Sequence, residues 1–338
     1  MRVVKTLSLL ATLGRVTLKV TGCERTVTTV EQVQTAEACF DCHSDSDLSL
    51  VSAEAQWQNS QHASGENIDR NTRGCENCHT HEGFLKVQTG ALLPDPFDNP
   101  TAIHCFTCHA PHSSGTLALR VNDSQILQDG SSYDLGGANI CSACHQARRD
   151  VNTYITEPTE LSEHFGPHHS PQTDMLLGTN GYEYPSYTYR DLSAHRSATT
   201  DGCLHCHYRV TSNYIVGGHS FNMEWDEGGE EVLNPEACEP CHAGLDDYNY
   251  AGIQDSTEAL LGRLGAALEA AGLLTAEGHP PDDVFTSADS AGAVWNYVYV
   301  EECQSHGVHN PWYTEDLLRS SLQFLSAAPA RGGPIAAR

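Results

Sequence analysis

Basic residues are scarce in this chain of 338 residues, where 18 lysines and arginines stand against 44 aspartates and glutamates. The formal net charge of −26 argues against partners that are themselves polyanions, so we expect no nucleic acid and no anionic membrane surface. Long apolar runs are also missing, and none approaches the roughly 18 residues that a membrane-spanning helix needs. Any attachment to a membrane would then depend on a lipid anchor.

Regular periodicity is absent up to about residue 250. This stretch is rich in Gly, Ser, Asn, Asp, His and Tyr, and it sustains neither the period of 2 of a strand nor the 3.6 of a helix. The sequence therefore predicts a mostly irregular fold with short helices. Such a chain buries too little apolar surface to offset the entropy lost on ordering, so something besides side chains must stabilise it.

Cysteine is abundant, and twelve of the 14 cysteines fall into six Cys-x-x-Cys-His motifs. This motif attaches c-type haem: the two thiols bond the porphyrin, and the histidine is the proximal ligand of the iron. The sequence therefore predicts six covalently bound haem c groups. The motifs comprise Cys39, Cys42 and His43; Cys75, Cys78 and His79; Cys105, Cys108 and His109; Cys141, Cys144 and His145; Cys203, Cys206 and His207; and Cys238, Cys241 and His242.

Two other uses of paired cysteines explain the pattern less well. Zinc ribbons take four thiolates per metal ion and need no histidine after the second cysteine, yet all six motifs have one. A disulfide framework needs neither the uniform spacing nor the histidines.

The six motifs begin 36, 30, 36, 62 and 35 residues apart, which is too irregular for a solenoid of fixed period. The short intervals leave little polypeptide between neighbouring haems and favour a tight stack within a haem domain spanning 23–250. The haems would serve as its core, and their covalent links would restrict the unfolded chain as disulfides do. We expect the 62-residue interval after Cys141 to fold out as a loop.

The N-terminus has features of an export signal over 1–22. Arg2 and Lys5 precede an apolar run, although Arg15 and Lys19 interrupt it, and Cys23 follows a sequence similar to a lipoprotein cleavage site. Haem is attached outside the cytoplasm, so export is expected on that ground too. Cys23 is therefore a candidate for lipidation.

Three helices are predicted in the C-terminal segment 251–326. The first begins at Asp255, with Glu258 as a capping partner, and carries a leucine stripe that includes Leu260, Leu264 and Leu268. The second spans 287–303, and the third follows Pro311. The small-residue tail 327–338 is expected to be flexible.

Thirteen of the 19 histidines remain besides the six expected proximal ligands, enough to give every iron a second histidine. Several segments around them resemble multihaem cytochromes of metal-reducing bacteria, including extracellular ones that polymerise into conducting filaments: 57–63, 108–112, 165–172, 193–195 and 217–221. The segment 305–311 resembles the end of the pentahaem nitrite reductases. In such proteins a histidine in each kind of segment commonly supplies the distal iron ligand. The resemblance therefore implies His62, His112, His168, His195, His219 and His309 as distal ligands.

The remaining histidines are expected to have other roles. His169 adjoins His168 and would act beside the ligand, while His164, His205, His279 and His306 are expected not to bind iron. His81 and His104 stay as weaker alternatives. Cys303 lies outside every motif; it would be a buried thiol or pair with Cys23.

These features favour an electron carrier over an enzyme. Iron held by two histidines stays low-spin and keeps a low to moderate potential, which suits transfer between haems. The nitrite reductases carry a lysine-ligated haem at a Cys-x-x-Cys-Lys site, whereas all six motifs here end in histidine. A reductase of nitrite or hydroxylamine, and a subunit of a membrane quinone-oxidising complex, remain the alternatives.

The expected location is the cell surface or extracellular space, with the periplasm second. Expected partners are redox proteins or extracellular electron acceptors, together with further copies of the chain in a filament.

Overall fold

The structure is a computed structural model that describes residues 47–91 and 96–327. The predicted export signal, Cys23, the first motif with Cys39, Cys42 and His43, and the tail beyond Ala327 all lie outside these residues.

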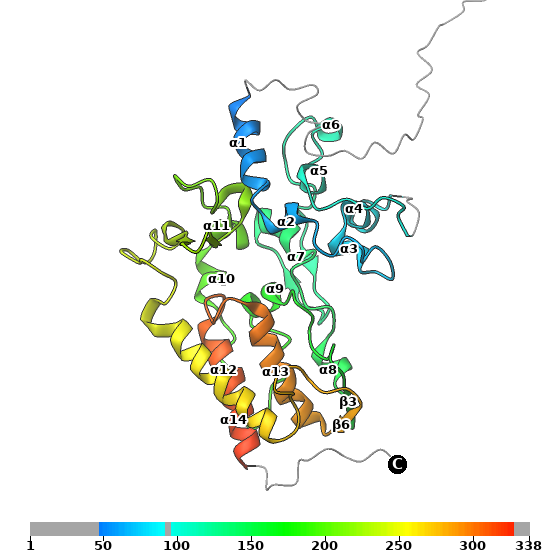
Figure 1. The fold of residues 1–338 in the computed structure, drawn as a ribbon, viewed down its shortest axis with the longest axis vertical. Helices are drawn as coiled ribbons and strands as arrows, with labels where there is room; N and C mark the ends of the chain where they lie inside the picture. Colours follow the sequence, from blue (N-terminus) through cyan, green and yellow to red (C-terminus); the bar gives the residue numbers. More distant parts are fainter. Residues whose placement is uncertain (1–46, 92–95, 328–338) are drawn as a thin grey trace, which may run out of the picture. The chain divides into compact units, whose positions relative to one another are not determined.

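Short helices joined by irregular chain make up the fold as far as residue 252, and they run from blue through green to yellow in Figure 1. Most span one or two turns, and four of them include residues of the motifs. In order they are α1 (Leu48–Trp57), α2 (Gln61–Ser64), α3 (Glu76–His79), α4 (His81–Thr89), α5 (Cys105–Cys108), α6 (Pro111–Ser114), η2 (Gly136–Ala138), α7 (Asn139–Ser142), α8 (Val151–Tyr154), α9 (Gln172–Leu177), α10 (Ala194–Ala198), α11 (Cys203–His207), η3 (Gly218–Ser220), η4 (Pro235–Ala237) and η5 (Tyr250–Gly252).

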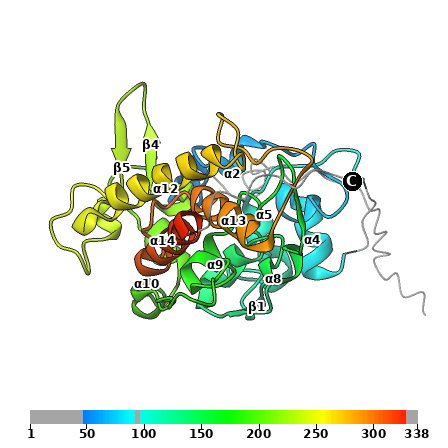
Figure 2. The ribbon, with the colours of Figure 1, turned by 90° about the horizontal axis from the view of Figure 1, so that it is seen from below.

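Strands form three antiparallel pairs in the described residues, each two or three residues long. They are β1 (Gln125–Ile126) with β2 (Ser132–Tyr133), β3 (Thr159–Leu161) with β6 (Val284–Thr286), and β4 (Glu224–Asp226) with β5 (Glu231–Leu233). The hairpin of β4 and β5 projects beside α12 in Figure 2, and Gly228 and Gly229 turn it with positive φ angles. The predicted fold class, mostly irregular with short helices and longer C-terminal ones, is confirmed.

The three C-terminal helices are α12 (Ile253–Ala270), α13 (Ala288–Cys303) and α14 (Pro311–Ala327), which pack against one another (Figure 1). The leucine stripe of α12 is buried as predicted, but the helix begins two residues before Asp255. The side chain of Asn249 caps it, accepting the amide hydrogens of Gln254 and Asp255 at 2.9 and 3.3 Å. None of the helices in the described part of the chain is both long and apolar enough to span a bilayer.

The hydrophobic core is built from these helices together with the chain that follows the fourth motif. Trp295 and Leu317 are fully buried, and Leu161 and Met175 from the long interval are buried among the same side chains. Residues 151–175 are therefore a structural part of the C-terminal core. The expectation that this interval folds out as a loop is wrong, because its apolar residues pack against the buried side chains of α13 and α14.

Candidate haem sites

The histidines of the five described motifs each lie opposite one histidine from another part of the chain. The ring centroids are 6.1 to 6.4 Å apart in every pair. Each pair joins one expected proximal ligand to one expected distal ligand. The pairs are His79 with His168 (6.2 Å), His109 with His219 (6.4 Å), His145 with His62 (6.1 Å), His207 with His309 (6.3 Å) and His242 with His195 (6.3 Å).

This separation is the one that two imidazoles on opposite sides of an iron require. A metal–imidazole bond is about 2 Å, and the ring centre lies about 1 Å beyond the bound nitrogen, so the centroids should be about 6 Å apart. The rings of His81 and His104 lie only 4.2 Å apart, too close for an iron between them. The donor set and spacing of the five pairs thus fit haem.

One turn of helix places the two thiols of a motif. In α3, α5 and α11 the motif lies on a single helical turn, so the two cysteines three positions apart share a face. The proximal histidine follows at or just after the end of the turn. Attachment and proximal ligation of a haem would therefore need only five consecutive residues.

The hydrogen bonds of two paired histidines fix the ring nitrogen that is free to bind iron. His195 and His207 each hold Nδ1 close to a backbone carbonyl, that of Val308 at 2.7 Å and that of Phe221 at 3.0 Å. A carbonyl only accepts, so Nδ1 carries the hydrogen and Nε2 keeps its lone pair. An outer partner of this kind also holds a metal-binding ring in its orientation.

Burial keeps three of the expected distal rings neutral, the form that binds a metal. Burial lowers the pKa of His62 to about 4, and the neighbouring His145 adds to this effect. The pKa of His168 is lowered to about 4, first by burial and then by Arg148. Burial likewise lowers the pKa of His309 to about 3. At neutral pH these rings present lone pairs rather than charge.

The described sites adjoin one another through their cysteines. The thiols of Cys78 and Cys144 are close enough to shift each other's pKa, and so are those of Cys141 and Cys203. The motif containing Cys141 and Cys144 therefore lies between the second and fifth motifs. Cys108 of the third motif packs with both of these cysteines around the buried Ile140.

His112 is the distal candidate that lies opposite no motif histidine among the described residues. It is exposed on α6, and its ring lies 5.6 Å from that of Phe106. The five described proximal histidines are all paired with other residues. His112 and the proximal His43, outside the described residues, are thus the two left over.

Histidines expected not to bind iron make other contacts. His164, His169 and His306 lie within 2.6 to 3.3 Å of glutamate carboxylates at the surface. His81, kept in the sequence analysis as a weaker alternative ligand, hydrogen bonds with Thr107 at 2.9 Å. Within the described residues, no three His, Cys, Asp or Glu side chains converge as a bare metal ion would require.

Two side chains contact these histidines in a way that the sequence did not predict. Gln172 Oε1 lies 3.4 Å from Nδ1 of His145, and the buried thiol of Cys303 lies 3.2 Å from Nδ1 of His309. The structure thus places Cys303 as a buried thiol beside an expected distal ligand. Neither residue belongs to a motif, so only the folded chain brings them to the rings.

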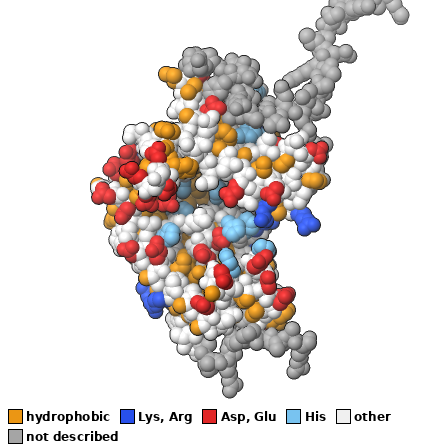
Figure 3. All heavy atoms as spheres, viewed as in Figure 1, with side chains coloured by type: hydrophobic (Ala, Val, Ile, Leu, Met, Phe, Trp, Pro, Cys, Tyr) orange, Lys and Arg blue, Asp and Glu red, His pale blue; other side chains and the backbone are white. Residues whose placement is uncertain are grey.

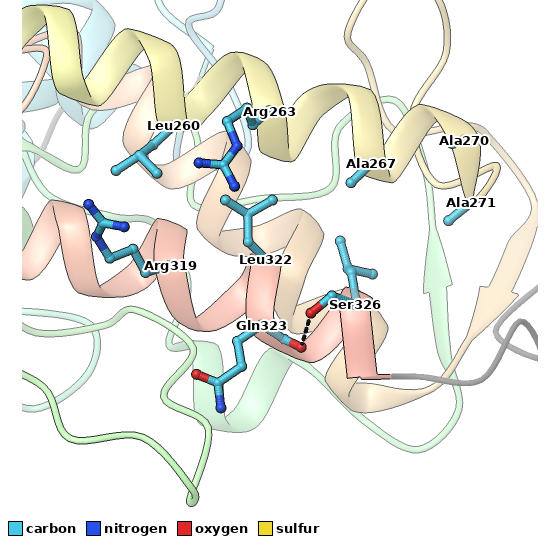
Figure 4. Close-up of a pocket in the computed structure, with 10 residues that line it drawn as sticks. Leu260, Arg263, Ala267, Ala270, Ala271, Arg319, Leu322, Gln323 and Ser326 are labelled. Carbon is cyan, nitrogen blue, oxygen red and sulfur yellow. Dashed lines mark hydrogen bonds between the residues drawn. The ribbon is translucent and has the colours of Figure 1, made fainter.

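A separate groove lies between α12 and α14 (Figure 4). Its volume is about 600 Å³, and Arg263 and Arg319 point into it among alanine and leucine side chains. None of its lining residues is a cysteine or histidine of the sites above.

No family model matches the chain. It is 25% identical over 296 residues to the C-type polyheme cytochrome OmcC of Geobacter sulfurreducens, a match that covers 74% of this chain and 36% of that protein. The chain thus spans about a third of this relative's length.

The fold is similar to the solved structure of the outer cell wall cytochrome OcwA, with a TM-score of 0.53 and 20% identity over 80% of this chain and 49% of that one. The undecaheme cytochrome from the S-layer of Carboxydothermus ferrireducens aligns less well, with a TM-score of 0.43 and 18% identity over 82% of this chain and 40% of its own. A chain with six haem-attachment motifs is thus similar in sequence to a polyheme cytochrome and similar in fold to OcwA.

Proposed function

We propose that the chain is an electron carrier that holds six haem c groups, each iron between two histidines. The observation that carries the proposal is the set of five histidine pairs, in which each described motif meets one distal candidate at 6.1 to 6.4 Å. The proposed ligand pairs are His79 with His168, His109 with His219, His145 with His62, His207 with His309, His242 with His195, and His43 with His112.

Ligation by two histidines favours transfer over catalysis. Bound haem iron supplies one-electron oxidation and reduction. In the five described pairs the two rings would both bind the iron, so no position would be left where nitrite or hydroxylamine could bind it. Two histidine ligands kept in both redox states would also make the structural change per electron small. A reductase would need at least one motif histidine without an opposing ring.

The adjacency of the sites supports transfer along the chain. Electrons tunnel efficiently only between closely spaced cofactors, and neighbouring motifs here approach one another through their cysteines. His309 also lies near His207, His195 and His145, which belong to three different pairs. An electron entering at one described site could therefore reach the others without leaving the chain.

We further propose that the protein works outside the cytoplasm, at the cell surface or in the extracellular space. Haem attachment takes place after export, and the similar protein OcwA is an outer cell wall cytochrome. The acceptors would be redox proteins or extracellular oxidants, and copies of the chain would associate into filaments. Lipidation of Cys23 would supply a membrane anchor.

Intact mass and visible spectra of the native protein test the proposal. The mass should exceed that of the polypeptide by six haems, which acid–acetone extraction should leave in place because thioether bonds hold them. The oxidised and reduced protein should show only low-spin haem and bind no carbon monoxide. Fewer than six haems would refute the count, and a full equivalent of high-spin, carbon monoxide-binding haem would favour a reductase.

A further inference from the structure

Cys303 is the last residue of α13 and the one described cysteine outside the motifs. Its side chain is only 3% exposed, and its sulfur lies 3.2 Å from Nδ1 of His309. Ser305 completes the arrangement: its hydroxyl lies 3.3 Å from the same sulfur and accepts the amide hydrogen of His309 at 3.3 Å. The thiol thus meets the ring of His309, and the hydroxyl meets its backbone.

The position of Cys303 is set by the helix rather than by the ligand. Tyr299 and Val300, one turn earlier on α13, are buried in the hydrophobic core, and Cys303 continues this buried face. The chain then reverses through Gln304 and Gly307, both with positive φ, and brings His309 back to the end of the helix. The position of the thiol is therefore set by the packing of α13, and the ring of His309 lies against it.

Other paired histidines have a different partner at the same ring atom. His195 and His207 donate from Nδ1 to backbone carbonyls at 2.7 and 3.0 Å. A carbonyl oxygen is a strong acceptor, and accepting this hydrogen makes the other nitrogen a better donor to a metal. Thiol sulfur accepts hydrogen bonds only weakly. The ring of His309 consequently gains less donor strength from its partner than these two rings do.

We propose that Cys303 is a positioning residue for His309, whose thiol accepts the hydrogen bond of Nδ1, directs Nε2 toward His207 and holds the iron of this pair at a higher potential than a carbonyl partner would. The inference rests on the proposed function, in that His207 and His309 hold a haem between them. A weakly donating ligand stabilises oxidised iron less, so the sulfur tunes the potential as well as orienting the ring.

Variants of the full, haem-loaded chain test this role. Cys303→Ala removes the acceptor, so the midpoint potential of one haem should shift upward and one set of low-spin resonance signals should change. Cys303→Ser supplies a stronger acceptor, so the same haem should shift downward. Val300→Ala makes a cavity on the same buried face without touching His309 and should leave the potentials unchanged.

The outcomes separate the inference from the function beneath it. If Cys303→Ala and Cys303→Ser both leave every potential and resonance signal as in the native protein, Cys303 is a packing residue and the inference is overturned. An equal shift in Val300→Ala would overturn it as well, because loss of packing alone would then explain the effect. If instead His309→Ala produces no high-spin haem, His309 is not an iron ligand, and this refutes the ligand assignment of the proposed function.

Discussion

The adjacent residues His168 and His169 make different contacts and have different expected roles. His168 lies opposite His79, whereas His169 turns to the surface and meets the carboxylate of Glu302 at 2.6 Å. His168 has a φ of +79°, a conformation that costs a non-glycine residue free energy. Such strain persists where the surroundings require it, here where the ring must point at His79.

Replacing each of these neighbours should give opposite results. His168→Ala should convert one haem from low-spin to high-spin and open it to carbon monoxide, because the iron bound by His79 would lose its distal ligand. His169→Ala removes the same ring one position later and should leave all haems low-spin. Optical and electron paramagnetic resonance spectra would decide, and a high-spin haem in His169→Ala alone would reverse the assignment.

Asp174 links the pH dependence of stability to one buried carboxyl group. Burial raises its pKa from 3.8 to about 6, although amide hydrogens from Ala147 and Asn180 act in the opposite direction. Between about pH 4 and pH 6 the folded chain holds a proton that the unfolded chain has lost. The free energy of unfolding should therefore fall as pH rises through this window and level off above it.

Asp174→Asn should remove this contribution. A shift of about 2 pKa units corresponds to about 3 kcal/mol, so the stability of the native chain relative to the variant should decrease by up to that amount from pH 4 to pH 7. Urea unfolding of both proteins at several pH values would measure it, and the other carboxyl groups cancel in the comparison. A difference that does not change with pH would show that Asp174 titrates normally.

At the scale of elements, α13 is defined by close contact as well as by apolar residues. A Cβ on Gly292 would lie 2.1 Å from the ring of Tyr182. That ring cannot move aside easily, because Tyr182 is held by two hydrogen bonds to α13. Its hydroxyl donates to Asp289 at 2.8 Å, and its backbone amide donates to the side chain of Asn296 at 2.7 Å. The glycine in the middle of the helix therefore serves packing.

Two glycine-to-alanine variants should change stability in opposite directions. Gly292→Ala should lower the free energy of unfolding by about 1–3 kcal/mol, because overpacking outweighs the better helix propensity of alanine. Gly262→Ala on α12 meets nothing within 4 Å and should raise it by about 0.5–1 kcal/mol. Denaturant unfolding would measure both changes. Stabilisation by Gly292→Ala would show that the ring of Tyr182 can move to make room for the added methyl group.

For the whole molecule, the net charge of −26 determines how copies of the chain interact over long distances. Figure 3 shows acidic side chains spread over the face in view, with basic ones in a few places only. Copies of such a chain repel one another, and the repulsion extends about 30 Å at 0.01 M salt but only about 3 Å at 1 M. Filaments would need haem contacts or cations to overcome it.

Self-association should therefore increase with ionic strength. The native protein should sediment as single chains at low salt and form larger assemblies as salt or divalent cations are added, since screening removes the repulsion. Sedimentation velocity would follow the change, and electron microscopy would show whether the assemblies are open filaments, as a head-to-tail interface requires. Discrete single chains under all conditions would favour a shuttle.

The sequence by itself determined the features that depend on neighbouring residues. The six motifs predict haem attachment because the thiols and the histidine lie within five positions of each other, and the irregular fold follows from the lack of periodicity. The first C-terminal helix was predictable from its leucine stripe, although the start of α12 was not, since the cap of Asn249 comes from outside the helix.

Only the tertiary structure decided which histidines meet. Six proximal and six distal candidates can be matched in many ways, and no local pattern tells His145 to lie opposite His62 or His207 opposite His309. The chain path between them sets these pairs, as it brings Cys303 to His309 and buries Met175 beneath α14. Contacts between residues distant in the chain depend on how the whole backbone packs, so a motif cannot specify them.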